Sequence, residues 1–378
     1  MQAWRKRVFG GVSIVAGVMA LAASSHAQSK PAPSASPRIN TTAQPRALLP
    51  ASQIKLQPVT VSPDLKKAIA SKPKFDQALL AQRISYVGNT PVLKIKNGKQ
   101  FQLQPLNEPP PPTTLQIKAL PQVLSPYKAH VEAPFVIGKR VIKLPDLSVS
   151  NMAHQTPVKD QGPRGTCTAF AAVGGLEARG KRQGVTRDLS ENHAFQLFMS
   201  ESGQTCTMGG GFVTWQTGPI LTERGVCQEP LMPYTSNACP SSIPVACQSG
   251  GNARFTSTAH FFTPTYGGTG VLRADNTNLL ESFIKAGHDI VYGLNVAGND
   301  WNDGSGVIDV QVDGSGNPAP SVGGHAMLIV GYNRAGNYFI VKNSWGTDWG
   351  HDGYAHISYE YLQTYGKYGY AVLNATVP

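Results

Sequence analysis

Hydrophobic and polar residues follow a clear pattern near the end of this chain. Residues 323–332 form an almost continuous apolar run that a histidine opens, and residues 338–346 form a second run that ends in Asn-Ser-Trp-Gly. Short apolar runs bounded by turn residues predict buried β-strands. The segment between them, residues 333–337, reads Asn-Arg-Ala-Gly-Asn and has the composition of a turn, so we expect the strands to pair as a hairpin.

This hairpin brings three chemically useful side chains together. Folding it about residues 334–335 places His325 opposite roughly residues 343–345. Asn343 can then hold the imidazole of His325 in one tautomer and orientation, and Trp345 can cover that hydrogen bond from water.

The pattern before residue 107 predicts a smaller folded segment. A Ser-Pro pair at residue 62 opens a short helix that stops before Pro73, and apolar residues between Phe75 and Ile84 indicate a second amphipathic turn or two. Residues 91–103 predict a hairpin around Asn97-Gly98. A three-residue loop, with Gly98 at positive φ, is preferred to a two-residue turn and pairs Leu93 with Phe101.

Composition divides the chain into regions. Residues 1–27 have a basic start, an apolar run of 16 residues and a small-residue cleavage site, so they predict a signal peptide, with an uncleaved anchor as the alternative. Residues 28–60 predict a disordered linker, and residues 61–142 a basic pro-region with a possible small inhibitory module and a Pro-rich spacer. The rest of the chain is expected to hold the functional domain, with no stable membrane span after signal cleavage.

The formal charge of +11 hides two opposite parts. Residues 1–145 hold 20 basic and 4 acidic residues, a net charge of +16, whereas residues 146–378 carry −5. Because the excess of positive charge lies before the functional domain, it argues against nucleic acid as a partner. It favours a basic segment lying on an acidic domain, and a solvated arm or a segment that binds anionic envelope polymers remain the alternatives.

Residues 157–170 carry the strongest chemical signal. Gln161 stands six residues before Cys167, with a Gly/Pro turn between them and a helix-like run after. A thiol at a helix start meets free N–H groups and the positive dipole end, which favour thiolate. The backbone N–H of Cys167 and the side-chain amide of Gln161 can both donate to an oxygen that becomes charged.

Together the Gln-to-Cys segment, the Gly-His-Ala strand and the Asn-Ser-Trp-Gly motif resemble the papain-like (cathepsin-like) cysteine peptidases, here as a secreted, bacterial-type preproenzyme. The resemblance covers nearly all of residues 144–375 and implies a peptidase domain at residues 143–378. It implies an α+β, two-lobed fold: a helical lobe that carries Cys167, an antiparallel β-barrel-like lobe that carries His325 and Asn343, and the active site in the cleft between them. It implies a Cys-His-Asn triad with Gln161 in the oxyanion hole.

The resemblance also implies which residues bind substrate: Gly210, Gly211, Phe212, Val213, Gly293, Ala326 and Trp345. Small residues at Gly293 and Ala326 are expected to leave room for a bulky apolar group, although these positions could equally be core packing. One departure is Arg164, which stands where the family usually has a disulfide cysteine.

Five cysteines lie after residue 166, so four remain when Cys167 is set aside as nucleophile. Two disulfides are expected, and the sequence itself leaves three connectivities open. The resemblance favours Cys206 with Cys239, and Cys227 with Cys247. Disulfides fit an exported destination, secreted, periplasmic or extracellular.

The predicted function is therefore a secreted thiol endopeptidase, made as a proenzyme that its own pro-region inhibits, acting on proteins or peptides without metal or cofactor. The acidic residues between Asp300 and Asp313 fail EF-hand spacing, because Trp301 would occupy a ligand position. The alternatives are a transpeptidase or amidase that uses the same triad, and a non-catalytic cell-envelope-binding protein on a peptidase fold.

Overall fold

The structure is a computed structural model that divides into two units, residues 1–45 and 46–378. All described residues lie in the second unit, and they are 54–106, 136–137, 140–141, 148–207, 211–212, 214–248, 250–268 and 273–378. The predicted signal peptide and most of the predicted linker lie outside them.

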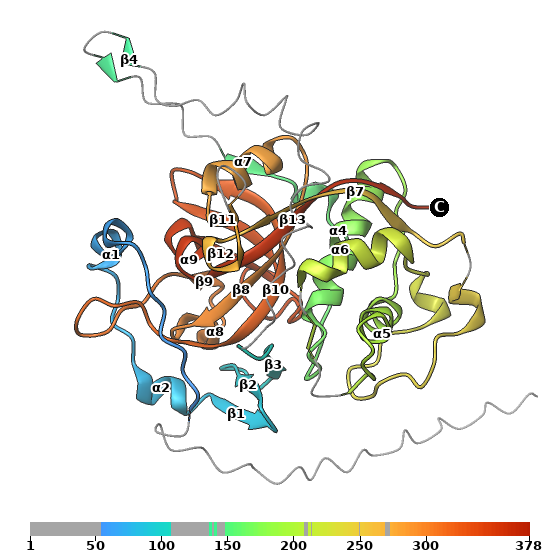
Figure 1. Cartoon of the computed structure of the whole chain (residues 1–378), viewed down its shortest axis with the longest axis horizontal. Coiled ribbons are helices and arrows are strands. Elements are labelled where there is room, and N and C mark those ends of the chain that lie inside the picture. Colours follow the sequence, from blue (N-terminus) through green and yellow to red (C-terminus); the bar gives the residue numbers. More distant parts are fainter. Residues whose placement is uncertain are drawn as a thin grey trace, which may run out of the picture. The chain divides into compact units, whose positions relative to one another are not determined.

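Three helices form the helical lobe (Figure 1): α4 (Cys167–Arg182), α5 (Glu191–Glu201) and α6 (Thr214–Glu223). Ser190 caps the start of helix α5, since its hydroxyl accepts a hydrogen bond from the N–H of His193 at 3.0 Å. Helix α4 is buried along most of its length and lies close against the sheet. A Cβ at Gly175 would stand 3.2 Å from Val372, so glycine permits this approach.

An eight-stranded sheet forms the sheet lobe, in the order β7-β13-β8-β10-β11-β12-β9, with β6 paired to β10. The strands are β6 (Ser148–Ser150), β7 (Arg254–Phe262), β8 (Ile290–Ala297), β9 (Val307–Ile308), β10 (Ser321–Asn333), β11 (Tyr338–Lys342), β12 (Tyr354–Ser358) and β13 (Gly366–Thr376). The short helices α7 (Thr277–Lys285), α8 (Asp300–Asp303) and α9 (Tyr359–Tyr365) accompany them. The 3₁₀ turns of the described residues are Met152–His154, Glu229–Leu231, Val245–Gln248 and Pro264–Tyr266.

The predicted late hairpin is confirmed. Strands β10 and β11 pair antiparallel with Leu328 opposite Lys342, and Asn337 in the turn takes a φ of 56°. This register points His325 toward residue 345. The two-lobed α+β class is confirmed by the helical and sheet elements, whose apolar residues form two large cores, one among α4, α5 and the sheet face and one around β8, β10 and β11.

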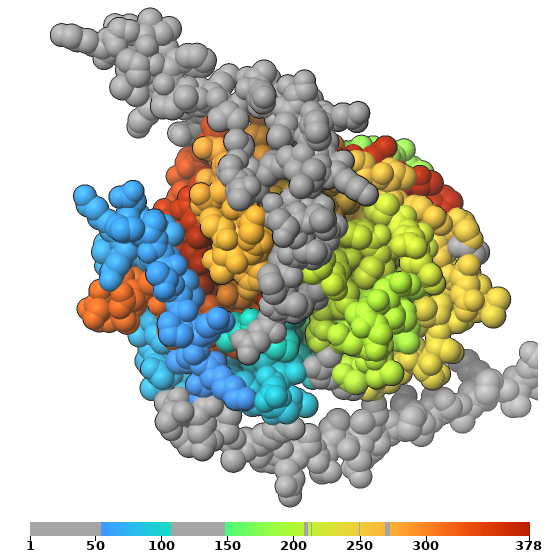
Figure 2. Space-filling model, in the orientation of Figure 1, coloured from blue at the N-terminus to red at the C-terminus, as the bar shows by residue number. Residues whose placement is uncertain are grey.

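Residues 54–106 fold as a small module: α1 (Pro63–Ile69), α2 (Gln77–Ala81), β1 (Ile84–Val87), β2 (Thr90–Lys94) and β3 (Gln100–Gln102). The expected register is present, with Leu93 opposite Phe101 and Gly98 at a φ of 90°. The module shares the core of the sheet lobe through Ile69, Leu80 and Phe101. Figure 2 shows these blue and teal residues lying against the orange part of the sheet lobe. Farther on, β4 (Val136–Ile137) pairs with β5 (Arg140–Val141).

Two disulfides join the loops of the helical lobe: Cys206 with Cys239, and Cys227 with Cys247. This is the pairing that the resemblance favoured. No helix among the described residues has the length and apolar character that a membrane span requires.

Candidate active site

Cys167 is the first residue of helix α4, is fully buried and takes part in neither disulfide. The preceding Thr166 stands at the N-cap position but does not cap the helix with its side chain. The first N–H groups of the helix therefore face the region of the sulfur without a side-chain cap, and the positive end of the dipole favours the thiolate.

His325 and Asn343 meet across the β10–β11 hairpin. The Nε2 atom of His325 lies 2.8 Å from Oδ1 of Asn343, and that oxygen also accepts from the N–H of Ser344 at 2.8 Å. Because Oδ1 can only accept, Nε2 carries the proton. The other ring nitrogen, Nδ1, is buried without a hydrogen-bond partner, so it is the atom left to exchange a proton.

Aromatic rings enclose this pair. The ring centroid of Trp345 lies 4.9 Å from that of His325, and Trp301 meets the imidazole edge to face at 6.0 Å. Burial lowers the pKa of His325 to about 4, against the smaller raising effect of the hydrogen bond to Asn343. The imidazole is therefore neutral near pH 7 in this form of the protein.

Three hydrogen bonds join Gln161 to Ser344 and Arg164. Its backbone N–H donates to the carbonyl of Ser344 at 2.8 Å, and its Oε1 accepts from the Ser344 hydroxyl at 2.6 Å. Its Nε2 donates to the carbonyl of Arg164 at 2.8 Å. A carboxamide nitrogen has two protons, so one of the two side-chain N–H groups of Gln161 takes part in none of these hydrogen bonds.

The structure describes only some of the predicted substrate-binding residues, and they differ in what surrounds them. Gly210 and Val213 lie outside the described residues. The ring of Phe212 stacks on Phe198 of α5 at 5.2 Å and belongs to the core of the helical lobe, and its carbonyl accepts from Nε2 of Gln104. Gly211 lies under the side chain of Gln104, whose Cγ would be 3.1 Å from a Cβ at this position.

The space expected beside Gly293 is filled. Gly293 and Ala326 are opposite each other on β8 and β10, and Tyr368 of β13 is opposite Gly293 on the other side. A Cβ at Gly293 would stand 2.5 Å from the ring of Tyr368 and 3.0 Å from Oγ1 of Thr214. The expectation of room for a bulky group is therefore wrong at Gly293, because this glycine accommodates a ring of its own chain.

Sequence reasoning missed two residues near the site. Gln104 pairs its backbone with Gly324, the residue before His325, through bonds of 2.7 and 2.8 Å, and its Nε2 donates to the carbonyl of Phe212. No motif marks this glutamine. Ser344 stands inside the Asn-Ser-Trp-Gly motif, and its proximity to Asn343 is the signal that could have found it.

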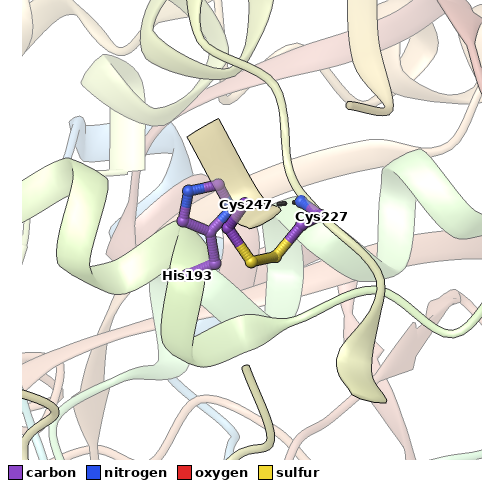
Figure 3. Close-up of side chains that lie close together, drawn as sticks. All are labelled: His193, Cys227 and Cys247. Atoms are coloured by element: carbon purple, nitrogen blue, oxygen red, sulfur yellow. Dashed lines mark hydrogen bonds between the residues drawn. A yellow bond between two sulfur atoms is a disulfide. The ribbon is translucent and has the colours of Figure 1, made fainter. Parts of the chain in front are cut away.

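One group of potential metal ligands occurs among the described residues: His193, Cys227 and Cys247, with ligand atoms within 4.8 Å of one another (Figure 3). The two sulfurs are joined in a disulfide, and Nδ1 of His193 accepts from the N–H of Cys227 at 3.0 Å. Metals bind thiolates, so this group offers no thiolate ligand while the disulfide is intact.

Comparison with known proteins agrees with this geometry. The family described as papain family cysteine protease matches residues 146–373, which is more than half of the chain. The chain belongs to this family.

Its similarity to individual relatives is modest. It is 29% identical to cathepsin K of Gallus gallus over 221 residues, covering 56% of this chain and 58% of the relative. It is 24% identical to ananain of Ananas comosus over 245 residues, covering 61% and 63%. The chain thus spans less than two thirds of the length of these relatives. Xylellain, a cysteine protease from Xylella fastidiosa, is 21% identical with a TM-score of 0.49, covering 64% of this chain and 94% of that chain.

Proposed function

We propose that this chain is the precursor of an exported thiol endopeptidase. The observation that carries the proposal is the 2.8 Å hydrogen bond between His325 and Asn343, which leaves Nδ1 of the buried imidazole without a hydrogen-bond partner. The one cysteine outside the two disulfides, Cys167, begins helix α4. Family membership supports the same chemistry.

In the proposed reaction, the Cys167 thiolate attacks the carbonyl carbon of a peptide bond, while His325 carries the thiol proton as imidazolium. The remaining N–H of Gln161 and the backbone N–H of Cys167 hold the oxyanion. Collapse of the intermediate breaks the C–N bond, and His325 gives its proton to the departing amine. Water then hydrolyses the thioester and regenerates the thiol.

Residues 54–106 are proposed to be the intramolecular inhibitor. Gln104 supports this role because it bonds both lobes, with its backbone on Gly324 of β10 and its side chain on Phe212 ahead of α6. The ring of Phe101 stacks on Trp345 at 4.6 Å with nearly parallel planes. A peptide substrate reaching His325 would have to displace this segment.

Charges complement this contact. The Nζ of Lys99, at the tip of the β2–β3 hairpin, lies 2.9 Å from Asp160 and 2.6 Å from Asp348. Asp160 is the residue before Gln161. These pairs are partly exposed, so each is expected to contribute at most about 1 kcal/mol, and they serve mainly to orient the hairpin.

Export is proposed from the predicted signal peptide together with the two disulfides, which persist in oxidising compartments.

The test is self-processing of the purified precursor. At mildly acidic pH with a thiol reductant, the wild-type precursor should shorten to a form lacking residues 54–106 and then hydrolyse peptide substrates. Cys167→Ala should stay full length. The matched control is Ser200→Ala, an exposed residue of α5, which should process as the wild type does. Shortening of Cys167→Ala at the wild-type rate would refute the proposal.

A further inference from the structure

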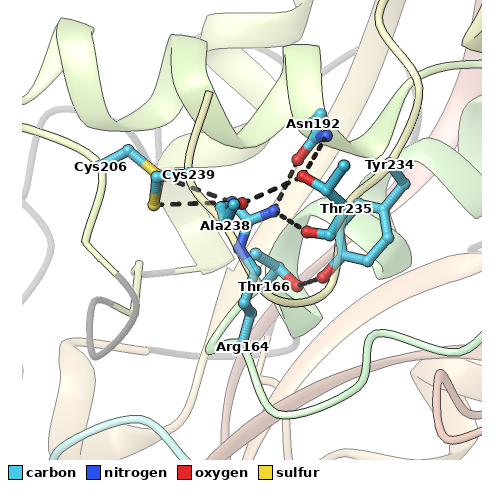
Figure 4. The surroundings of a disulfide bond; sticks show 8 residues. All are labelled: Arg164, Thr166, Asn192, Cys206, Tyr234, Thr235, Ala238 and Cys239. Atoms are coloured by element: carbon cyan, nitrogen blue, oxygen red, sulfur yellow. Dashed lines mark hydrogen bonds between the residues drawn. A yellow bond between two sulfur atoms is a disulfide. The ribbon is translucent and has the colours of Figure 1, made fainter. Parts of the chain in front are cut away.

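The turn that links Gln161 to Cys167 contains a buried cation, Arg164, at the position where the papain-like family usually has a disulfide cysteine. Arg164 is only 1% exposed. Its Nη1 donates to Oδ1 of Asn192 and to the carbonyl of Thr235, each at 2.6 Å. Its Nη2 approaches the two sulfurs of the Cys206–Cys239 disulfide at 3.5 and 3.9 Å (Figure 4).

The guanidinium also packs on aromatic rings. It lies 5.2 Å from the ring centroid of Tyr234 and 5.6 Å from that of Phe195. Tyr234 in turn meets Phe170 of α4 edge to face at 4.8 Å. Arg164 thus fixes the position of the Tyr234 ring through both a ring contact and the hydrogen bond to the neighbouring residue 235.

The hydroxyl of Tyr234 reaches both ends of the same turn. It donates to the backbone carbonyl of Gln161 at 2.7 Å, and it lies 2.7 Å from Oγ1 of Thr166, the residue before Cys167. A phenol has one proton, so Thr166 must be the donor in the second bond. Burial raises the pKa of Tyr234 to about 12, which keeps this donor protonated under ordinary conditions.

We propose that Arg164 and Tyr234, here called the Arg164–Tyr234 clamp, are positioning residues that set the distance between the Gln161 carboxamide and the Cys167 sulfur. The clamp acts on Gln161 at its backbone carbonyl through Tyr234 and at its side-chain Nε2 through the Arg164 carbonyl. This inference rests on the proposed function, because it concerns how the oxyanion donor is held.

The first test is Tyr234→Phe in the processed enzyme, which removes one oxygen and keeps the ring. Loss of an entire oxyanion donor lowers kcat about 100- to 1,000-fold, so misplacement of the donor should lower kcat roughly tenfold, with KM within about twofold of wild type. Tyr338→Phe is the matched control, because its hydroxyl accepts only a 3.3 Å bond from Asn333 far from the turn, and it should leave kcat unchanged.

A double-mutant cycle separates positioning from general structural support. In a Gln161→Ala background the side-chain oxyanion donor is already gone, so adding Tyr234→Phe should lower kcat by less than about a further twofold. Arg164→Lys replaces the planar guanidinium, whose Nη1 makes both 2.6 Å bonds, and it should show the same non-additivity. If Tyr234→Phe lowered kcat by the same factor with and without Gln161, the proposal would be overturned.

Alkylation of Cys167 by a haloacetamide gives a further readout, since that reaction forms no oxyanion. Its rate and pH profile should match wild type in Tyr234→Phe, and a rate lowered as much as kcat would also overturn the proposal. If the processed wild-type chain alkylates but hydrolyses no peptide, the proposed function itself fails. If it hydrolyses peptides and Tyr234→Phe equals wild type, only the clamp fails.

Discussion

At the scale of single residues, His325 is held in a neutral, enclosed state. Burial lowers its pKa to about 4, whereas an exposed histidine titrates near 6.5. A thiolate–imidazolium pair needs a protonated ring, so this environment opposes the pair that the proposed reaction requires. Phe101 contributes to the enclosure because it covers Trp345, which in turn covers His325.

Removing residues 54–106 should therefore raise the pKa of His325. In Cys167→Ala protein, which is expected to stay full length, NMR titration should place the pKa of the ring near 4, and in the trimmed protein this pKa should lie nearer 6.5. This pKa difference also makes stability depend on pH. Between about pH 4 and 6.5 the histidine of the unfolded chain is protonated, whereas His325 of the folded precursor is not. His325 thus makes the precursor less stable as pH falls from about 6.5 toward 4. Identical titration curves for both forms would contradict this.

At the scale of elements, the β2–β3 hairpin carries the contact between the module and the site. Phe101 is 1% exposed, stacks on Trp345 and belongs to the core of the sheet lobe. Lys99 orients the tip through Asp160 and Asp348. Since the surface ion pairs are weak, the aromatic contact is expected to dominate the hold of the hairpin.

Phe101→Ala should loosen the hairpin. Replacing a buried Phe by Ala typically costs about 3–5 kcal/mol, so amide exchange across residues 90–103 should accelerate strongly in Cys167→Ala protein. In otherwise wild-type precursor, the same change should speed self-shortening. Lys94→Ala, at an exposed position of β2, is the control and should change neither rate. Unchanged protection in Phe101→Ala would show that other contacts hold the hairpin.

The expectations from sequence were correct for features that depend on residues close together in the sequence. The hairpin that joins His325 to Asn343 followed from a turn between two apolar runs, and the Leu93–Phe101 register followed from a three-residue loop. Gly293 failed because the ring that fills its space comes from residue 368, far along the chain. Gln104 was missed for a related reason: its role depends on two lobes that only the fold brings to it.

At the scale of the whole molecule, the N-terminal module is part of a shared hydrophobic core. Buried residues of the module, among them Ile69, Leu80, Ile84 and Leu93, belong to the same cluster as the sheet lobe. The helical lobe has its own core and both disulfides. Loss of the module should therefore weaken the sheet lobe more than the helical lobe.

Calorimetry can test this asymmetry. Trimmed Cys167→Ala protein should unfold at a lower temperature than the full-length variant, because a segment that binds only the folded state stabilises it. Adding the separate 54–106 peptide in excess should restore part of the difference. An unchanged melting temperature after trimming would mean that the shared core contributes nothing to stability.

The central claim is that the sulfur of Cys167 becomes acylated during turnover. Processed enzyme should be mixed with a peptide ester and quenched with acid within milliseconds, then digested and analysed by mass spectrometry. The account predicts an acyl group on the peptide that contains Cys167, absent from Cys167→Ala, and accumulating when Gln161 is intact. Ester turnover with no adduct at Cys167, or an adduct on another residue, would contradict it.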